Sequence, residues 1–185
     1  MDRRPLLALA TLALAAPACA QFGGAEDRFN LGARIGVYLP TDSAIRDAFG
    51  NSIVTYGIGS VGGRRPTPGK ITPEVDFISA SRNGNRLFIG SLTFGYEYHF
   101  SKQLEQTTIP YARVFGGAAY FDYGINTSAN TRVSARKVGL NYGAEVGLLF
   151  VNRVRLAARY NAFTEQDGFN FNGVVLTATA NLFRF

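Results

Sequence analysis

The amino-acid sequence predicts an all-β protein in which eight antiparallel strands close into an up-and-down barrel. Two observations predict this fold: long segments alternate apolar residues with small or charged ones, and the 185-residue chain, which contains 21 glycines, shows no long helical periodicity. Successive side chains of a strand point to opposite faces, so a period of two separates two faces of different character. We therefore expect each strand to divide two environments.

The clearest alternation runs through residues 136–163. One face is formed by apolar residues at even-numbered positions: Val138, Leu140, Tyr142, Ala144, Val146, Leu148, Phe150, Val154, Leu156, Ala158, Tyr160 and Ala162. The odd-numbered positions are mostly small, polar or charged. The two-residue link Val151-Asn152 separates the two halves, which predicts a tight hairpin of long strands, the sixth and seventh of the chain.

The first strand is predicted over residues 29–39, where odd-numbered apolar residues alternate with asparagine, glycine and arginine. Residues 41–50 are predicted to form a short helical segment in the first loop. Asp42 or Ser43 is suited to cap its start, and Gly50 is suited to end it.

A second strand is predicted over residues 52–60, followed by a turn or loop at residues 61–70, which are rich in glycine, proline and arginine. Residues 71–79 form the third strand, with its apolar face at odd-numbered positions. Pro73 weakens that strand because proline donates no ladder hydrogen bond. The sequence Asn83-Gly84-Asn85 then predicts a hairpin turn.

The fourth strand covers residues 88–100, and its aromatic side chains lie at even-numbered positions. After a polar link at residues 101–107, the fifth strand covers residues 109–123 and carries aromatic side chains on both faces. Polar loops are predicted at residues 124–135 and 164–170.

The eighth strand is predicted over residues 171–185. Most of the eight strands reach the roughly 9 to 11 residues that a tilted membrane strand needs.

Residues 1–20 are predicted to be a secretory signal peptide, which leaves residues 21–185 as one barrel domain. Two arginines precede an apolar run at residues 6–16, and Ala18-Cys19-Ala20 has the pattern of a cleavage site. The apolar run is about half the roughly 20 residues that cross a bilayer as a helix. Because Cys19 is the chain's one cysteine, the mature protein is expected to contain no disulfide.

The composition excludes several classes of protein. No later run of 18 apolar residues is present, so a helical membrane protein is excluded. The formal net charge of +6 suits anionic surfaces, and nucleic acid is not an expected partner of an exported chain. With one histidine and scattered carboxylates, neither a metal site nor a cofactor is expected.

Side-chain size indicates which face of the barrel points outward. An eight-stranded barrel is just wide enough inside to be filled by side chains, and the aromatic residues of the apolar face would crowd it. The opposite face contains many glycines, which leave room for long charged neighbours. The charges expected in the lumen are Arg34, Glu74, Asp76, Glu97, Arg113, Glu145, Arg155 and Arg159. Enclosed charges must pair; the alternative is that they form an ordinary solvated outer face.

Several segments resemble known barrels. They are Gly32-Ala33-Arg34-Ile35-Gly36-Val37-Tyr38, and Tyr96-Glu97-Tyr98-His99-Phe100 leading to Pro110-Tyr111, Gly116-Gly117 and Tyr120, together with a terminal phenylalanine. These segments resemble small eight-stranded outer-membrane barrels of the outer membrane protein A and outer membrane protein W types, within the outer-membrane β-barrel domain superfamily. The resemblance implies location in the outer membrane of a bacterial envelope.

The resemblance also implies that the terminal aromatic strand is the signal read by the barrel-insertion machinery, a role we assign to Phe183 and Phe185. Both residues fall in the polar register of the eighth strand, with Thr177 and Thr179. Either a β-bulge shifts the end of the strand, or recognition depends mainly on the final aromatic residue.

We expect a non-enzymatic, monomeric envelope protein with a structural or adhesive role. Its external loops would be residues 41–51, 124–135 and 164–170, and its partners would be outer-membrane lipids and, during biogenesis, periplasmic chaperones. One alternative, implied by the W-type resemblance, is a narrow channel for small or hydrophobic solutes. Another is a secreted soluble barrel that binds an apolar ligand.

A fourth hypothesis is a lipid A-modifying hydrolase. His99 and Ser101 are two residues apart, as in the active strand of outer-membrane lipid A deacylases, and Glu97 or Glu105 would orient the histidine. Such chemistry requires the histidine within hydrogen-bond reach of the hydroxyl.

Overall fold

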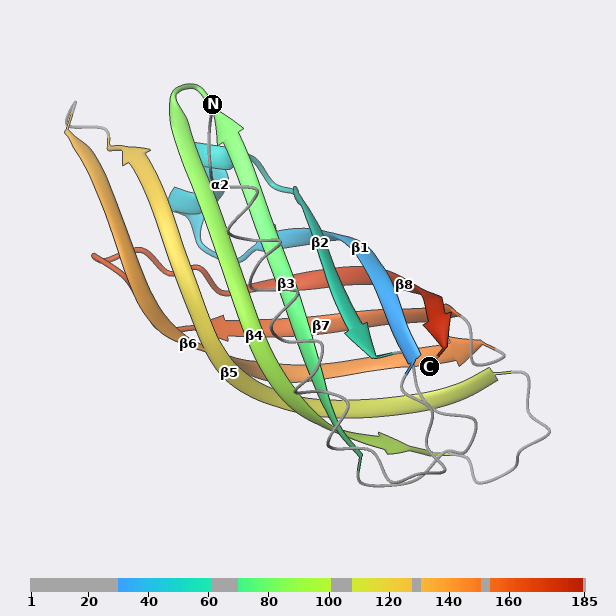
Figure 1. Cartoon of the computed structure of the whole chain (residues 1–185). Helices are drawn as coiled ribbons and strands as arrows, with labels where there is room; N and C mark the ends of the chain where they lie inside the picture. The colour runs from blue at the N-terminus through green and yellow to red at the C-terminus, as the bar shows by residue number, and fades with distance from the viewer. Residues whose placement is uncertain (1–29, 61–69, 101–107, 128–130, 151–153, 185) are drawn as a thin grey trace.

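The computed structural model confirms the predicted fold class, a closed barrel of eight antiparallel strands in sequence order (Figure 1). It describes residues 30–60, 70–100, 108–127, 131–150 and 154–184. The strands are β1 (Asn30–Pro40), β2 (Ile53–Ser60), β3 (Lys70–Arg82), β4 (Asn85–His99), β5 (Thr108–Asn126), β6 (Arg132–Phe150), β7 (Val154–Phe163) and β8 (Gly173–Arg184), and the helix α2 covers Ser43–Phe49.

The barrel has two ends, which we name by what lies there. At the helix end lie α2, the β3–β4 turn and the segment that joins β7 to β8; at the terminal end, β1 begins and β8 finishes. Figure 1 shows the β3–β4 and β5–β6 hairpins projecting at the helix end, with α2 beside the first of them. Among the described residues, no helix is long and apolar enough to span a membrane.

The two faces of the strands follow the predicted registers. On the outward face, Ile35 is 63% exposed, Phe94 51% and Leu140 60%. In β5, whose faces both carry aromatic residues, Tyr111 and Phe115 point inward and are buried. The alternation therefore separates an apolar outer wall from a lumen.

The β5–β6 hairpin is longer than predicted. Residues 124–135 are mostly strand, because β5 continues to Asn126 and β6 begins at Arg132; the prediction of a polar loop there is wrong. The polar residues of this hairpin still satisfy each other's backbone groups across the β5–β6 ladder. The predicted signal peptide at residues 1–20, most of the loop at 61–70, the link at 101–107 and Phe185 lie outside the described residues.

The end of β8 contains the register shift that would move its last residues. Gly32 of β1 pairs with Asn181, whereas the preceding Leu31 pairs with Phe183, so Leu182 is the extra residue of a β-bulge. A β-bulge is therefore present at the end of β8, and the role of Phe183 and Phe185 as an insertion signal stays a prediction.

Local turn chemistry explains both predicted connections at the helix end. Asn83 and Gly84 have φ values of 51° and 77°, as a two-residue turn between right-twisted strands requires. The Asp42 side chain caps α2 by accepting a hydrogen bond from the Ala44 N–H at 2.7 Å. Gly50 ends the helix with φ of 99°, so the capping residues were predicted correctly.

The helix-end half of the lumen is filled by apolar side chains. Ile45 and Phe49 of α2 enter a buried cluster formed mainly by aromatic and aliphatic residues from the strands. Phe171 is fully buried there, with ring centroids 5.5 Å from Phe121 and 5.3 Å from Tyr123. Helix α2 therefore closes this end of the barrel by hydrophobic packing.

We expect Phe171→Ala to reduce the free energy of unfolding by about 3–5 kcal/mol, because it leaves a cavity in this packed cluster. Urea unfolding of the barrel in detergent micelles, followed by gel mobility, measures the change. The matched control is Phe94→Ala, which removes the same side chain from the outer wall, where detergent or lipid replaces the lost contacts. An equal loss in the two variants would contradict a packed helix-end cluster.

Candidate functional site

The lumen nearer the terminal end contains the eight charged residues selected from the alternation. The structure places each of them inside the barrel, with at most 9% of its surface exposed. They come from six of the eight strands: Arg34, Glu74, Asp76, Glu97, Arg113, Glu145, Arg155 and Arg159. Four arginines face four carboxylates, so the set is electrically balanced.

Glu74 is the centre of this charged cluster. Its Oε1 lies 2.6 Å from Arg34 Nη2, and its Oε2 lies 2.5 Å from Arg113 Nη1. Arg159 Nη1 is 3.3 Å from Oε2, and Arg155 Nη1 is 3.5 Å from Oε1. A single carboxylate from β3 thus joins guanidinium groups from β1, β5 and β7, which offsets the cost of removing these charges from water.

The other three carboxylates complete the cluster. Asp76 accepts from Arg159 at 2.6 Å and from Arg34 at 3.0 Å. Glu97 accepts from Arg155 Nη2 at 2.6 Å. Glu145 lies 3.9 Å from Arg113 and 3.8 Å from Arg155, and it accepts a hydrogen bond from the Tyr111 hydroxyl at 2.6 Å. Each of the four acids therefore has at least one arginine within ion-pair distance.

Aromatic rings and glycines shape the space around the charges. The Arg159 guanidinium lies 3.9 Å from the centroid of the Phe115 ring, and the Arg155 guanidinium lies 4.6 Å from that of Tyr111. A side chain at Gly95 would place its Cβ in the space that the Arg113 guanidinium occupies. The inward glycine therefore makes the close approach of this long side chain possible.

His99 lies at the terminal end of β4 and belongs to the same cluster. Its Nε2 is 2.6 Å from Glu97 Oε1, and its ring meets Tyr111 edge to face at 6.3 Å. The orienting carboxylate of the hydrolase hypothesis is therefore in place as Glu97. Ser101, its proposed nucleophile, and Glu105 lie outside the described residues.

The apolar half of the lumen was not predicted from the sequence. The inner face was expected to be polar or charged throughout, whereas Leu87, Ile89 and Phe121 occupy inward positions near the helix end. A signal was present, since both faces of β4 and β5 are apolar close to the Asn83-Gly84 turn. Strands apolar on both faces are buried on both faces, so this pattern predicts a plug at that end.

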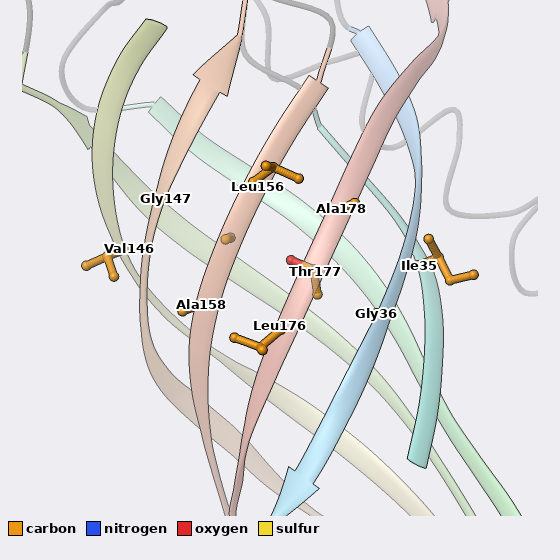
Figure 2. A pocket seen from close by; sticks show the side chains of 10 residues that line it. Ile35, Gly36, Val146, Gly147, Leu156, Ala158, Leu176, Thr177 and Ala178 are labelled. Atoms are coloured by element: carbon orange, nitrogen blue, oxygen red, sulfur yellow. The ribbon is translucent and has the colours of Figure 1, made fainter. Parts of the chain in front are cut away.

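A shallow groove of about 530 Å³ crosses the outer wall over β1, β6, β7 and β8 (Figure 2). Its outward side chains are Ile35, Val146, Leu156, Ala158, Leu176 and Ala178. The two alanines form a low floor between larger neighbours. The groove offers mainly apolar contact, as a lipid chain needs, with Thr177 also in its lining, and it carries none of the lumen's charged groups.

At the helix end, Asp167 connects the β7–β8 segment to the barrel. Its carboxylate accepts hydrogen bonds from the Tyr123 hydroxyl at 2.5 Å and from the Lys137 ammonium group. These two donors, first of all Lys137, hold the pKa of Asp167 below its ordinary value. Among the described residues, no group of three or more potential metal ligands is present.

Two solved structures share this fold. The chain is similar to the N-terminal β-barrel domain of OprF from Pseudomonas aeruginosa, with a TM-score of 0.56 and 13% identity over 84% of this chain and 99% of that one. It is also similar to Neisserial surface protein A, with a TM-score of 0.58 and 10% identity over 86% of this chain and all of that one. No family model and no curated protein sequence matches the chain.

At these identities the likeness concerns the fold alone. Both neighbours are covered almost completely, and the described strands of this chain form the same kind of closed eight-stranded barrel. The chain therefore has the fold of the small outer-membrane barrels.

Glu74→Gln should reduce the free energy of unfolding by about 3–5 kcal/mol, because it leaves buried arginines without their shared charge. Urea midpoints of the folded barrel in micelles measure the loss. Glu165→Gln, which makes the same change at an exposed position, is the matched control and should shift the midpoint little. Equal midpoints for the two variants would place the Glu74 carboxylate in a solvated site.

The Asp167 contact should weaken in acid. A carboxyl group whose pKa is lower in the folded state stabilises the fold above its unfolded pKa, near 3.8, and loses that contribution as pH falls through the lowered value. The protection factors of residues 164–172 in hydrogen exchange should therefore fall below pH of about 4. Asp167→Asn should show the faster exchange already at neutral pH; an unchanged rate would contradict a stabilising contact.

Proposed function

We propose that this protein is a monomeric outer-membrane barrel with a structural or adhesive role in the envelope, and that it is not an open channel. The observation that carries the proposal is the distribution of side chains across the barrel wall. Val138 is 73% exposed, whereas Arg155 and Thr179 are fully buried. A soluble protein rarely exposes so many large apolar residues, so this wall is suited to lipid.

The height of the outer wall supports insertion. On β4 and the residue that follows it, the outward apolar residues run from Phe88 to Phe100, broken by Gly90. At about 3.3 Å per residue and a tilt near 40°, this run spans about 30 Å, the thickness of a bilayer's hydrocarbon core. Aromatic residues at its two ends, Phe88 and the neighbouring pair Tyr98 and Phe100, suit the two interfaces. In such a membrane the helix end would face the outside of the cell.

The contents of the lumen argue against the channel alternative. A narrow passage would have to cross the charged cluster around Glu74 and then the apolar cluster around Phe171. Helix α2 covers the second cluster and inserts its own fully buried Ile45 into it. The same filling argues against a soluble carrier, because an apolar ligand would need an empty lumen.

The structural or adhesive role rests on the helix end. There the β3–β4 and β5–β6 hairpins, α2 and residues 164–172 present polar and charged side chains, including Asp47, Arg136 and Glu165. Loops on a rigid barrel are where contacts with other molecules are usually made. Assembly would depend on periplasmic chaperones and on insertion machinery reading the end of β8.

Single-channel recording tests the filled lumen directly. We expect wild-type protein in planar bilayers to show no steady conductance, because both halves of the lumen are occupied. A variant that lacks residues 42–50, and with them the α2 plug, should remain closed at the charged cluster. Steady openings of the wild-type protein would support the channel alternative instead.

Fractionation tests the membrane location. The mature chain should remain in the envelope fraction and require detergent for extraction. Its gel mobility should differ between unheated and heated samples, because heating unfolds the barrel. Recovery from the soluble periplasm without detergent would overturn the proposal. For the hydrolase alternative, the lipid A profile of cells carrying His99→Ala should equal that of wild type.

A further inference from the structure

We propose that three arginines on the outer wall at the helix end bind the phosphate group of an anionic lipid. They are Arg86 of β4, with Arg132 and Arg136 of β6. Arg86 and Arg136 pair with Asp122 of β5, and we call these four residues the arginine edge. The proposal rests on the proposed function, because a lipid can reach this wall only if the barrel lies in a membrane.

The strand register places the arginine edge directly above the apolar wall. Tyr120 of β5 pairs with Val138 of β6, and two residues further Asp122 pairs with Arg136. On β4, Phe88 pairs with Asp122 and is two residues from Arg86, on the same outward face. Three adjacent strands thus change from apolar to charged within two residues of one another, as expected where lipid headgroups begin.

Contacts within the arginine edge leave donors available. Arg86 Nη2 lies 2.9 Å from Asp122 Oδ1, and Arg136 Nε lies 3.2 Å from Asp122 Oδ2. The Arg86 and Arg136 side chains remain 41% and 59% exposed. Arg86 Nε has no hydrogen-bond partner in the described part of the chain, but it is buried, so a ligand would reach the exposed part of this side chain and not Nε. One carboxylate therefore orients two guanidinium groups without satisfying either completely.

Gly124 brings the third arginine into the group. A Cβ built on Gly124 would lie 2.8 Å from Arg132 Nη2, so the guanidinium occupies the place of the missing side chain. Gly124 pairs with Arg86 across the β4–β5 ladder. Arg132 has no ion pair with any described residue. It therefore lies beside Arg86 as an uncompensated positive charge.

The chemistry of the arginine edge fits a phosphate. Three arginines and one aspartate give a net charge of +2, close to the two negative charges of a phosphate monoester. Guanidinium groups offer paired donors that match phosphate oxygens. Just below lie the aromatic residues Phe88 and Tyr120, whose ring centroids are 6.5 Å apart. They provide a surface for the lipid's upper acyl segment. We therefore assign a phosphorylated lipid, from the membrane leaflet at the helix end, as the ligand of the arginine edge.

The chain contains no tryptophan, so a single substitution creates a local reporter. Tyr120→Trp places the reporter below the arginine edge, and Tyr160→Trp places a control reporter on the outer wall of β7. Each protein is reconstituted into vesicles of equal parts phosphatidic acid and phosphatidylcholine, with brominated acyl chains on only one of the two lipids. The lipid composition is the same in the two preparations. The ratio of quenching by brominated phosphatidic acid to quenching by brominated phosphatidylcholine therefore gives the local preference for the phosphate lipid.

We expect the reporter of the Tyr120→Trp protein to show a preference for phosphatidic acid of about five-fold or more, and the control reporter to show no preference. Arg132→Gln should reduce the preference about five-fold, the effect of one arginine near an anionic headgroup. This change breaks no ion pair, so the fold is preserved. Replacing all three arginines by glutamine should remove the preference. Lys137→Gln, which removes the same charge on the inward side of β6, should leave it within about two-fold.

The outcomes separate the two proposals. Equal quenching by both lipids at both positions would overturn the lipid site and leave the membrane barrel intact. An equal effect of Lys137→Gln and Arg132→Gln would also overturn it, because general electrostatic attraction would then explain the preference. Absence of quenching by either brominated lipid, at either position, would show that the barrel does not enter the bilayer and would overturn both proposals.

Discussion

Glu74 and the four arginines around it form the interaction on which the architecture depends. A carboxylate and four guanidinium groups, all excluded from water, hold together β1, β3, β5 and β7 across the lumen. Backbone ladders join only neighbouring strands, so they fix the wall but not its interior. The charged cluster connects walls that have no backbone contact, and it is stable only because every acid in it has an arginine partner.

The charged cluster also explains why polar side chains lie inside this barrel and large apolar side chains lie outside. Long arginine side chains fill a narrow lumen where inward glycines such as Gly95 leave space. The large apolar residues must then face outward, and a lipid environment is the one that accommodates them. Toward the helix end the lumen changes to apolar packing, with Phe171 and α2 in place of ion pairs. Two different kinds of packing thus fill one continuous interior.

The outer wall is equally non-uniform. Its β4–β5–β6 side carries aromatic residues that end at Arg86, Asp122 and Arg136, whereas the β7–β8–β1 side carries a shallow groove with an alanine floor. In the proposed membrane location these differences would suit different parts of a lipid, headgroups on the first side and acyl chains on the second. In a barrel whose lumen is filled, this wall and the helix-end segments are the surfaces left for interaction.

The sequence by itself determined the number and order of the strands, their inward and outward faces and the identity of the eight lumenal charges, but not the full length of β5 and β6. Those features depend on a period of two and on side-chain size, both of which are local. It also located Asp42 and Gly50 at the ends of α2, because capping depends on adjacent residues.

Only the tertiary structure decided which charges meet, because Glu74 and Arg159 are distant in sequence and are brought together by closure and strand stagger. The same applies to the apolar plug and to Arg132 lying over Gly124. Alternation assigns a side chain to a face but not to a level along the barrel axis. That level is set by the register of all eight strands together.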